Sequence, residues 1–108
     1  MSTKWSFHDE AAADLIEAVD RYKAERETLG AEFADAVDGM LDRLREASIP
    51  HLPVLSDENE LQGRVWRVLL SRFPYAIVFV KVDDAHFQIV AIAHLHRRPE
   101  YWRSRVEP

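Results

Sequence analysis

The sequence contains no cysteine, little glycine or proline, and no long apolar run. The absence of cysteine excludes disulfides, thiol chemistry and cysteine-ligated zinc. With 3 glycines, 5 prolines and 47% hydrophobic residues among 108, the composition is that of an ordered globular protein. No run approaches the roughly 20 apolar residues of a membrane span, and Asp9, Glu10 and Asp14 interrupt the place of a signal-peptide core. We therefore expect residues 1–108 to form a single soluble domain in the cytoplasm.

Charge is distributed unevenly along the chain. Residues 1–60 carry 6 Lys and Arg against 15 Asp and Glu, a net charge of −9, whereas residues 61–108 carry 8 against 4, a net charge of +4. A molecule with one basic end can be steered toward an acidic partner. The alternative is that the acidic half is simply the solvated outer face of helices.

The first part of the chain predicts a short strand over residues 4–7 and then a helix. Asp9 suits the N-cap position, and acidic residues fill the next turn, where the helix dipole favours them. Apolar residues follow at helical spacing: Ala12, Leu15, Ile16, Val19 and Tyr22. This helix is expected to run to about Glu27 and to break near Gly30.

A second helix should follow, with one apolar face. That face contains Phe33, Val37, Met40, Leu41 and Leu44. Because the two apolar stripes would face each other and a common sheet, residues 9–47 are predicted to form an antiparallel helical hairpin. The side chains expected to be buried between hairpin and sheet are Leu15, Val19, Phe33, Val37 and Leu41.

The remaining chain predicts a crossing loop and three strands. Two prolines forbid regular pairing within residues 48–62, which we expect to be a loop. Strands are expected at about residues 64–70, 75–82 and 86–95, joined by tight turns.

Pro99 suits the first position of a short terminal helix that contains Tyr101 and Trp102. The predicted fold class is therefore α+β: a strand, a helical hairpin, a mostly antiparallel sheet and a short C-terminal helix. Trp66 and Trp102 are expected to pack in the core and not to stack on nucleic-acid bases.

The last strand mixes polar and apolar side chains. Strict alternation predicts one face of Phe87, Ile89, Ala91, Ala93 and Leu95, and another of Gln88, Val90, Ile92, His94 and His96. Val90 and Ile92 would then lie on the open face of the sheet, and such a face usually requires a cover. The cover could be the terminal helix or a second protein.

This strand leads into a dense cationic and aromatic cluster. Its members are His94, His96, Arg97, Arg98, Tyr101, Trp102, Arg103 and Arg105. Because the rest of the chain is acidic, the cluster predicts a site for an anionic ligand or for a partner with an acidic face.

The order and spacing of these segments resemble the RelE/ParE superfamily of toxins from bacterial type II toxin–antitoxin systems. The resemblance covers residues 5–103 and is carried by the acidic start of the first helix and by residues 30–33, 64–70, 72–79, 91–94 and 97–102. It implies a small protein held inactive by a cognate antitoxin, in a complex that can regulate its own operator through the antitoxin. When freed, RelE-like members cleave messenger RNA on the ribosome, whereas ParE-like members poison DNA gyrase.

RNA cleavage requires removal of a proton from the 2′-hydroxyl, charge balance at phosphorus and protonation of the leaving oxygen. The resemblance places Arg67 at the first basic strand position, His96 near another, and Tyr101 and Trp102 where a terminal aromatic hydroxyl is expected. Ala76 stands where an arginine is usual, so the nuclease set is incomplete. If the protein is a nuclease, its catalytic residues would be Arg67, His96, Tyr101 and Trp102.

Contacts with an antitoxin or target are expected from the other basic residues: Arg64, Arg72, His94, Arg97, Arg98 and Arg103. The i, i+2 spacing of His94 and His96 suits a metal, but no third ligand lies nearby in sequence, so we expect neither a metal nor another cofactor. A net charge of −5 disfavours docking into ribosomal RNA. The sequence therefore favours a ParE-like toxin acting on DNA gyrase. The alternatives are a RelE-like ribosome-dependent mRNA endonuclease and an inactive antitoxin-binding regulator.

Overall fold

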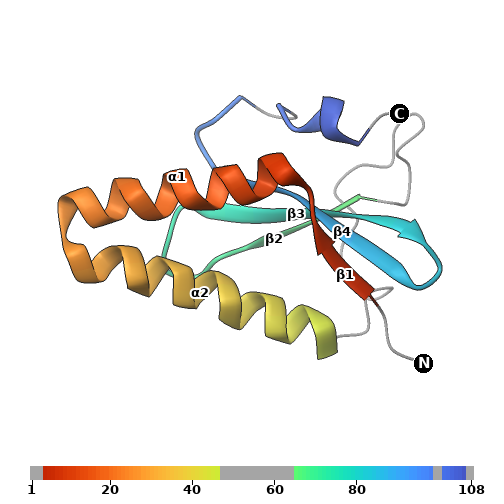
Figure 1. The fold of residues 1–108 in the computed structure, drawn as a ribbon, viewed down its shortest axis with the longest axis horizontal. Coiled ribbons are helices and arrows are strands. Elements are labelled where there is room, and N and C mark those ends of the chain that lie inside the picture. The colour runs from red at the N-terminus through yellow and green to blue at the C-terminus, as the bar shows by residue number, and fades with distance from the viewer. Residues whose placement is uncertain (1–3, 47–64, 99–100, 107–108) are drawn as a thin grey trace.

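The computed structural model describes residues 4–46, 65–98 and 101–106. Its elements are β1 (Lys4–Phe7), α1 (Asp9–Glu25), α2 (Glu27–Glu46), β2 (Val65–Leu69), β3 (Tyr75–Asp83), β4 (His86–His94) and the 3₁₀ helix η3 (Arg103–Arg105). The helices run antiparallel and lie over one face of a four-stranded sheet (Figure 1). This confirms the α+β fold class and the helical hairpin. The loop predicted over residues 48–62, together with Arg64 and Pro99, lies outside the described residues.

His8, and not Asp9, caps the N-terminus of α1. His8 has extended backbone angles (φ −66°, ψ 143°), and its Nδ1 accepts a hydrogen bond from the Glu10 N–H at 3.0 Å. The His8 N–H donates to the Ile89 carbonyl at 2.8 Å, so β1 leads directly into the helix. The prediction was wrong by one residue because an imidazole fills the role that short polar side chains usually take.

The break between the helices lies at Arg26, and the predicted break at Gly30 is wrong. Arg26 is extended (φ −161°, ψ 126°), and α2 begins at the next residue. Gly30 is buried inside α2 where it crosses α1: a Cβ there would lie 2.9 Å from the Val19 carbonyl oxygen and 3.1 Å from the Lys23 Cβ. Close helix contact therefore explains this glycine, and a helix stop does not.

Gly30→Ala should lower the free energy of unfolding by about 1–3 kcal/mol, because the added methyl group would meet a backbone atom of α1. Gly39→Ala is the matched control in the same helix. Nothing lies within 4 Å of its Cβ position, so it should gain about 0.5–1 kcal/mol from helix propensity. Urea denaturation measures both changes. Equal effects at the two glycines would contradict the close contact.

The sheet has the strand order β1-β4-β3-β2. β2 pairs antiparallel with β3, and β3 pairs antiparallel with β4, where Tyr75 lies opposite His94. These three strands confirm the predicted ones. β1 pairs in parallel with β4 as far as Ile89, so the sheet is mixed. Beyond Ile89, no other strand of the described residues borders that edge of β4.

The core between hairpin and sheet is formed largely by α2 and the central strands. Phe33, Val37 and Leu41 are buried there, as predicted. Leu15 and Val19 are only half-buried at its margin, which corrects the prediction for α1. That helix instead buries two small side chains, Ala11 and Ala18, and small side chains let a helix approach its neighbours closely. Trp66 packs in the same core, stacked on Phe79 at 5.6 Å, as expected for a packing residue.

A β-bulge in β4 overturns the predicted division of its faces. The register shifts between Val78 and Phe79, which makes Val90 an extra residue in the ladder. Ile92 therefore faces the helices, while Val90 and Ala91 belong to a second core on the opposite face. Val90 is 0% exposed and Ile92 2% exposed, so neither lies on an open surface.

The terminal segment of the chain covers this second core. Trp102 is 3% exposed and packs with Val65, Val78, Val80, Val90 and Ala91. The chain's own terminus thus provides one of the two predicted covers. The terminal helix is shorter than predicted, because Tyr101 and Trp102 lie in a turn before the three residues of η3. Among the described helices, none combines the length and apolarity that crossing a membrane requires.

Candidate functional site

Asp14 of α1 is the acceptor at the centre of a buried polar cluster. Its Oδ2 accepts hydrogen bonds from the Ile92 N–H at 3.2 Å, the Tyr101 hydroxyl at 2.9 Å and the Arg105 Nη1 at 2.8 Å. Its Oδ1 accepts from the Arg105 Nη2 at 3.3 Å. The side chains of Asp14 and Arg105 are 9% and 7% exposed, so this is a buried, bidentate ion pair. We call Asp14, Tyr101 and Arg105 the Asp14 clamp.

The Asp14 clamp closes the edge of β4 that β1 leaves uncovered. Arg105 Nη1 donates to the Val90 carbonyl at 2.8 Å, while Asp14 accepts the Ile92 N–H. These backbone groups therefore bond to an ion pair in place of another strand. Burial opposes the charged form of Arg105, but hydrogen bonding to Asp14 and its negative charge outweigh burial and raise the pKa of the guanidinium.

Tyr101 is held by contacts on both its ring and its hydroxyl. The Arg97 Cζ lies 3.6 Å from the ring centroid and the Arg105 Cζ lies 4.9 Å from it. Burial, followed by the hydrogen bond to Asp14 and the charge of that carboxylate, raises the pKa of Tyr101 above its ordinary value of 10.0. The hydroxyl thus stays protonated and donates a hydrogen bond to Asp14.

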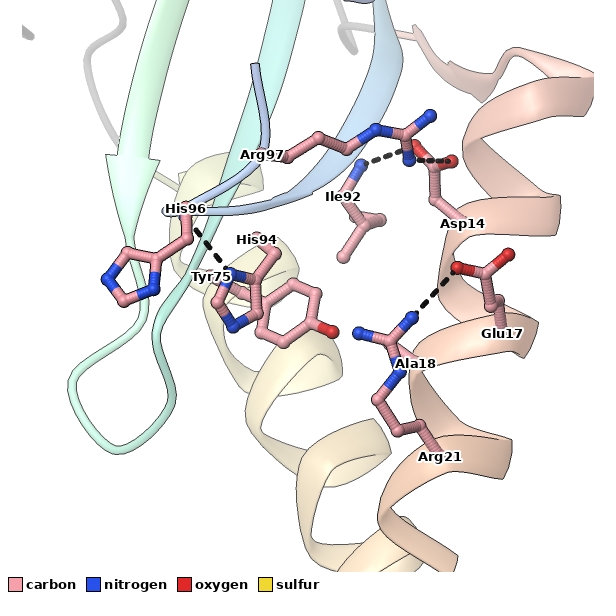
Figure 2. A pocket seen from close by; sticks show the side chains of 9 residues that line it. All are labelled: Asp14, Glu17, Ala18, Arg21, Tyr75, Ile92, His94, His96 and Arg97. Atoms are coloured by element: carbon pink, nitrogen blue, oxygen red, sulfur yellow. Dashed lines mark hydrogen bonds and ion pairs between the residues drawn. The ribbon is translucent and has the colours of Figure 1, made fainter. Parts of the chain in front are cut away.

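A groove opens next to the Asp14 clamp, between α1 and the end of β4 (Figure 2). Its volume is about 380 Å³, and it is lined by Asp14, Glu17, Ala18, Arg21, Tyr75, Ile92, His94, His96 and Arg97. Arg21 approaches from α1 and Arg97 from the turn after β4. Arg21 pairs with Glu17 at 3.1 Å, but both side chains are more than half exposed, so this pair contributes little. Guanidinium, imidazole and phenol donors meeting in one groove can bind an anion.

The imidazoles of His94 and His96 lie together at the open end of this groove. Their ring centroids are 5.2 Å apart, and the His94 ring meets the edge of Tyr75 at 5.0 Å. The His94 Nδ1 accepts the His96 backbone N–H at 3.0 Å, which leaves Nε2 to carry the proton of the neutral ring. Burial, then the neighbouring His96 and Arg21, lower the pKa of His94 below its ordinary 6.5.

The structure separates the residues proposed for RNA cleavage. Arg67 is exposed on β2 and follows Val65 by two residues, which places it on the face opposite the helices. Trp102 is buried on that same face, whereas His96 lines the groove on the helix side. Tyr101 reaches the helix side, where its hydroxyl is bound to Asp14.

The predicted binding residues are also divided. His94 and Arg97 meet in the groove, and Arg98 is exposed beyond it. Arg72 lies on another surface, where its Nη2 donates to Glu32 of α2 at 2.7 Å and lowers the pKa of that carboxyl. Arg103 is half-buried in η3.

Asp14, Arg21 and Tyr75 were missed as site residues by the sequence analysis, which placed Arg105 in the basic cluster but not beside Asp14. No local pattern marks Asp14, whose partners lie 78 to 91 residues away in the chain. The sequence offers only a general signal: a basic residue near the C-terminus could pair with an acidic residue of the first helix. It does not identify which acidic residue. No three His, Asp or Glu side chains in the described ranges are grouped so that they could hold a metal ion.

The sequence matches no family model and no curated protein. The fold does match a solved structure, a chain of the chromosomal ParDE toxin–antitoxin system from P. aeruginosa. The TM-score is 0.72 at 19% sequence identity, and the match covers 88% of this chain and 98% of that chain. The protein therefore has the RelE/ParE-like α+β fold that the sequence resemblance implied.

Proposed function

We propose that the protein is the toxin of a type II toxin–antitoxin system and that, when free of its antitoxin, it stops growth by a ParE-like action on DNA gyrase. The observation that carries this proposal is the fold, which matches the ParDE chain over almost its whole length. The segments that resemble the superfamily in sequence form the hairpin, the strands and the start of the terminal segment of this fold.

The positions and contacts of the four candidate nuclease residues support a toxin that acts by binding its target and not by cleaving RNA. The Tyr101 hydroxyl is occupied by Asp14 and its pKa is raised by burial, so it is a poor proton donor to a leaving oxygen. Trp102 is buried, and Arg67 lies on the face away from the groove. His96 is the one member of the four that lines the groove.

A RelE-like, ribosome-dependent mRNA endonuclease is the second candidate. The observation that favours it is the groove itself, in which His94, His96 and Arg97 lie together. An imidazole can accept and return a proton near neutral pH, and a guanidinium can balance phosphate charge. The two candidates predict different effects of losing His96.

Expression without antitoxin should separate these candidates. We expect growth arrest with filamentous cells and a DNA-damage response, while transcripts on ribosomes remain intact. His96→Ala should change this toxicity little. Ser104→Glu, at an exposed site of η3, should weaken it by adding a negative charge to the basic terminal segment.

Microscopy, a DNA-damage reporter and transcript mapping in the same cultures provide the readouts. Rapid transcript cleavage that His96→Ala abolishes would contradict the gyrase proposal and support the nuclease. Soluble, folded protein that affects neither process would favour an inactive regulator that binds its antitoxin.

A further inference from the structure

The acidic groups next to Arg97 do not fully neutralise its positive charge, and its side chain lines the groove. Its Nη1 lies 3.8 Å from the Asp14 Oδ1, beyond hydrogen-bond distance, and Asp14 is already neutralised by Arg105. Stacking on the Tyr101 ring at 3.6 Å holds the guanidinium plane in position. The edges of a stacked guanidinium remain available for the planar, bidentate recognition of an acid.

Other residues of the groove lining supply further donors. Among the described residues, the Arg21 guanidinium pairs with the exposed carboxylate of Glu17. His94 carries a proton on Nε2 because its Nδ1 accepts a backbone N–H. His94 faces Tyr75, His96 and Arg21, with Asp14, Glu17 and Arg97 completing the lining. An acidic group that entered the groove would therefore meet guanidinium donors from Arg97 and Arg21 and imidazole donors from the histidines in its lining (Figure 2).

The surroundings of the groove distinguish a single carboxylate from a nucleic-acid strand. The exposed side of α1 carries Asp9, Glu10, Glu17 and Asp20. A strand with a phosphate at every nucleotide would bring several negative charges against these acids, and that repulsion opposes binding. A single carboxylate whose neighbours are apolar or basic avoids this repulsion. Basic neighbours would instead be attracted to the acidic side chains of α1.

We infer that the groove binds an acidic side chain on a protein partner, within a segment whose flanking residues are apolar or basic. The inference rests on the proposed function for the identity of that partner, which would be the antitoxin. It assigns Arg97 as the principal contact, Tyr101 as the platform that orients it, and His94 and His96 as further donors.

Titration of the isotope-labelled full chain with small probes tests the groove without knowing the antitoxin. The probes are N-acetylglutamate amide, which has one carboxylate, N-acetylglutamine amide as its neutral match, inorganic phosphate, and a single-stranded oligouridine. We expect the glutamate probe to shift the side-chain signals of Arg97, His94 and His96 saturably, and the glutamine probe to leave them unchanged. Absence of shifts with the glutamate probe, or tighter binding of phosphate or oligouridine, would overturn the inference.

Two neighbouring arginines provide matched variants. Arg97→Gln should weaken binding of the glutamate probe by roughly two- to fivefold, the size expected for one partly exposed ion pair. Arg98→Gln should not change it, because Arg98 is exposed but does not line the groove. Equal effects of the two substitutions would show that the probe senses general surface charge, and would overturn the assignment of Arg97.

Binding should also tighten as pH falls below about 6.5. Burial, then the neighbouring His96 and Arg21, lower the pKa of His94 below that value, so its ring gains a positive charge only in this range, while the probe stays ionised. The His94→Gln variant should lose this dependence. If the wild type shows no pH dependence, His94 is not a contact and its assignment fails.

The two proposals fail in different ways. If the wild-type chain is toxic but does not bind the glutamate probe, the acid-binding groove is rejected and the toxin function stands. If the chain binds the probe but has no effect on growth, the toxin function is rejected and the acid-binding groove stands.

Discussion

Asp14→Ala should lower the free energy of unfolding by about 3–5 kcal/mol, because it would leave the buried charge of Arg105 without its counter-charge. It would also remove the acceptor of the Ile92 N–H on the open edge of β4, and an unsatisfied buried donor has its own cost. Chemical denaturation measures the loss. Near-ultraviolet circular dichroism should show whether Trp102 and the terminal segment have loosened before the rest of the fold.

Asp20→Ala is the matched control for this prediction. Asp20 lies on the same helix and is exposed, so its loss should change stability by no more than about 0.5 kcal/mol. A loss at Asp14 as small as that at Asp20 would mean that solvent reaches Arg105 and that the clamp contributes little.

Asp14→Asn separates the charge of the carboxylate from its geometry. The amide oxygen can still accept the Ile92 N–H, but it cannot neutralise Arg105, so we expect a loss smaller than that of alanine and larger than that of the control. If asparagine and wild type were equally stable, hydrogen bonding and not charge would be the main contribution of Asp14.

Leu41→Ala should lower the free energy of unfolding by about 2–5 kcal/mol, through lost apolar burial and the cavity left behind. Leu41 is 7% exposed on α2 and packs in the core beneath the hairpin. Asp38→Ala, at an exposed position one turn earlier, should be nearly neutral. Thermal unfolding is the measurement, and a shift of only about a degree at Leu41 would contradict the helical register.

The Asp14 clamp and the groove are mechanically related. Asp14 holds Tyr101 by its hydroxyl, and the ring of Tyr101 in turn supports Arg97. A change at Asp14 is therefore expected to affect binding through the position of Arg97, even though the carboxylate itself is saturated by Arg105. Arg97→Gln removes the contact directly and leaves the clamp's three hydrogen-bonding residues in place.

Periodicity in the sequence alone determined the elements of this protein. The 3.6-residue spacing of Phe33, Val37, Leu41 and Leu44 defined the buried face of α2, which the structure confirms. The apolar runs after residue 64 likewise predicted β2, β3 and β4 close to their observed limits. These features depend on the burial of each segment's own side chains, and a segment displays that pattern wherever it lies in the fold.

The tertiary structure decided the features that depend on contacts between distant residues. The bulge at Val90 reverses the facing of Ile92, and strict alternation cannot show where a ladder gains a residue. The local sequence around Gly30 predicts a helix stop, yet a glycine is needed there because α2 contacts Val19 of α1 at this position. Asp14 is one of many acids in the sequence, and only the packing of α1 against β4 brings it to Arg105, 91 residues away. The sequence therefore predicted the basic residues His94, His96 and Arg97 of the groove, but not its α1 wall, because long-range packing brings α1 beside them.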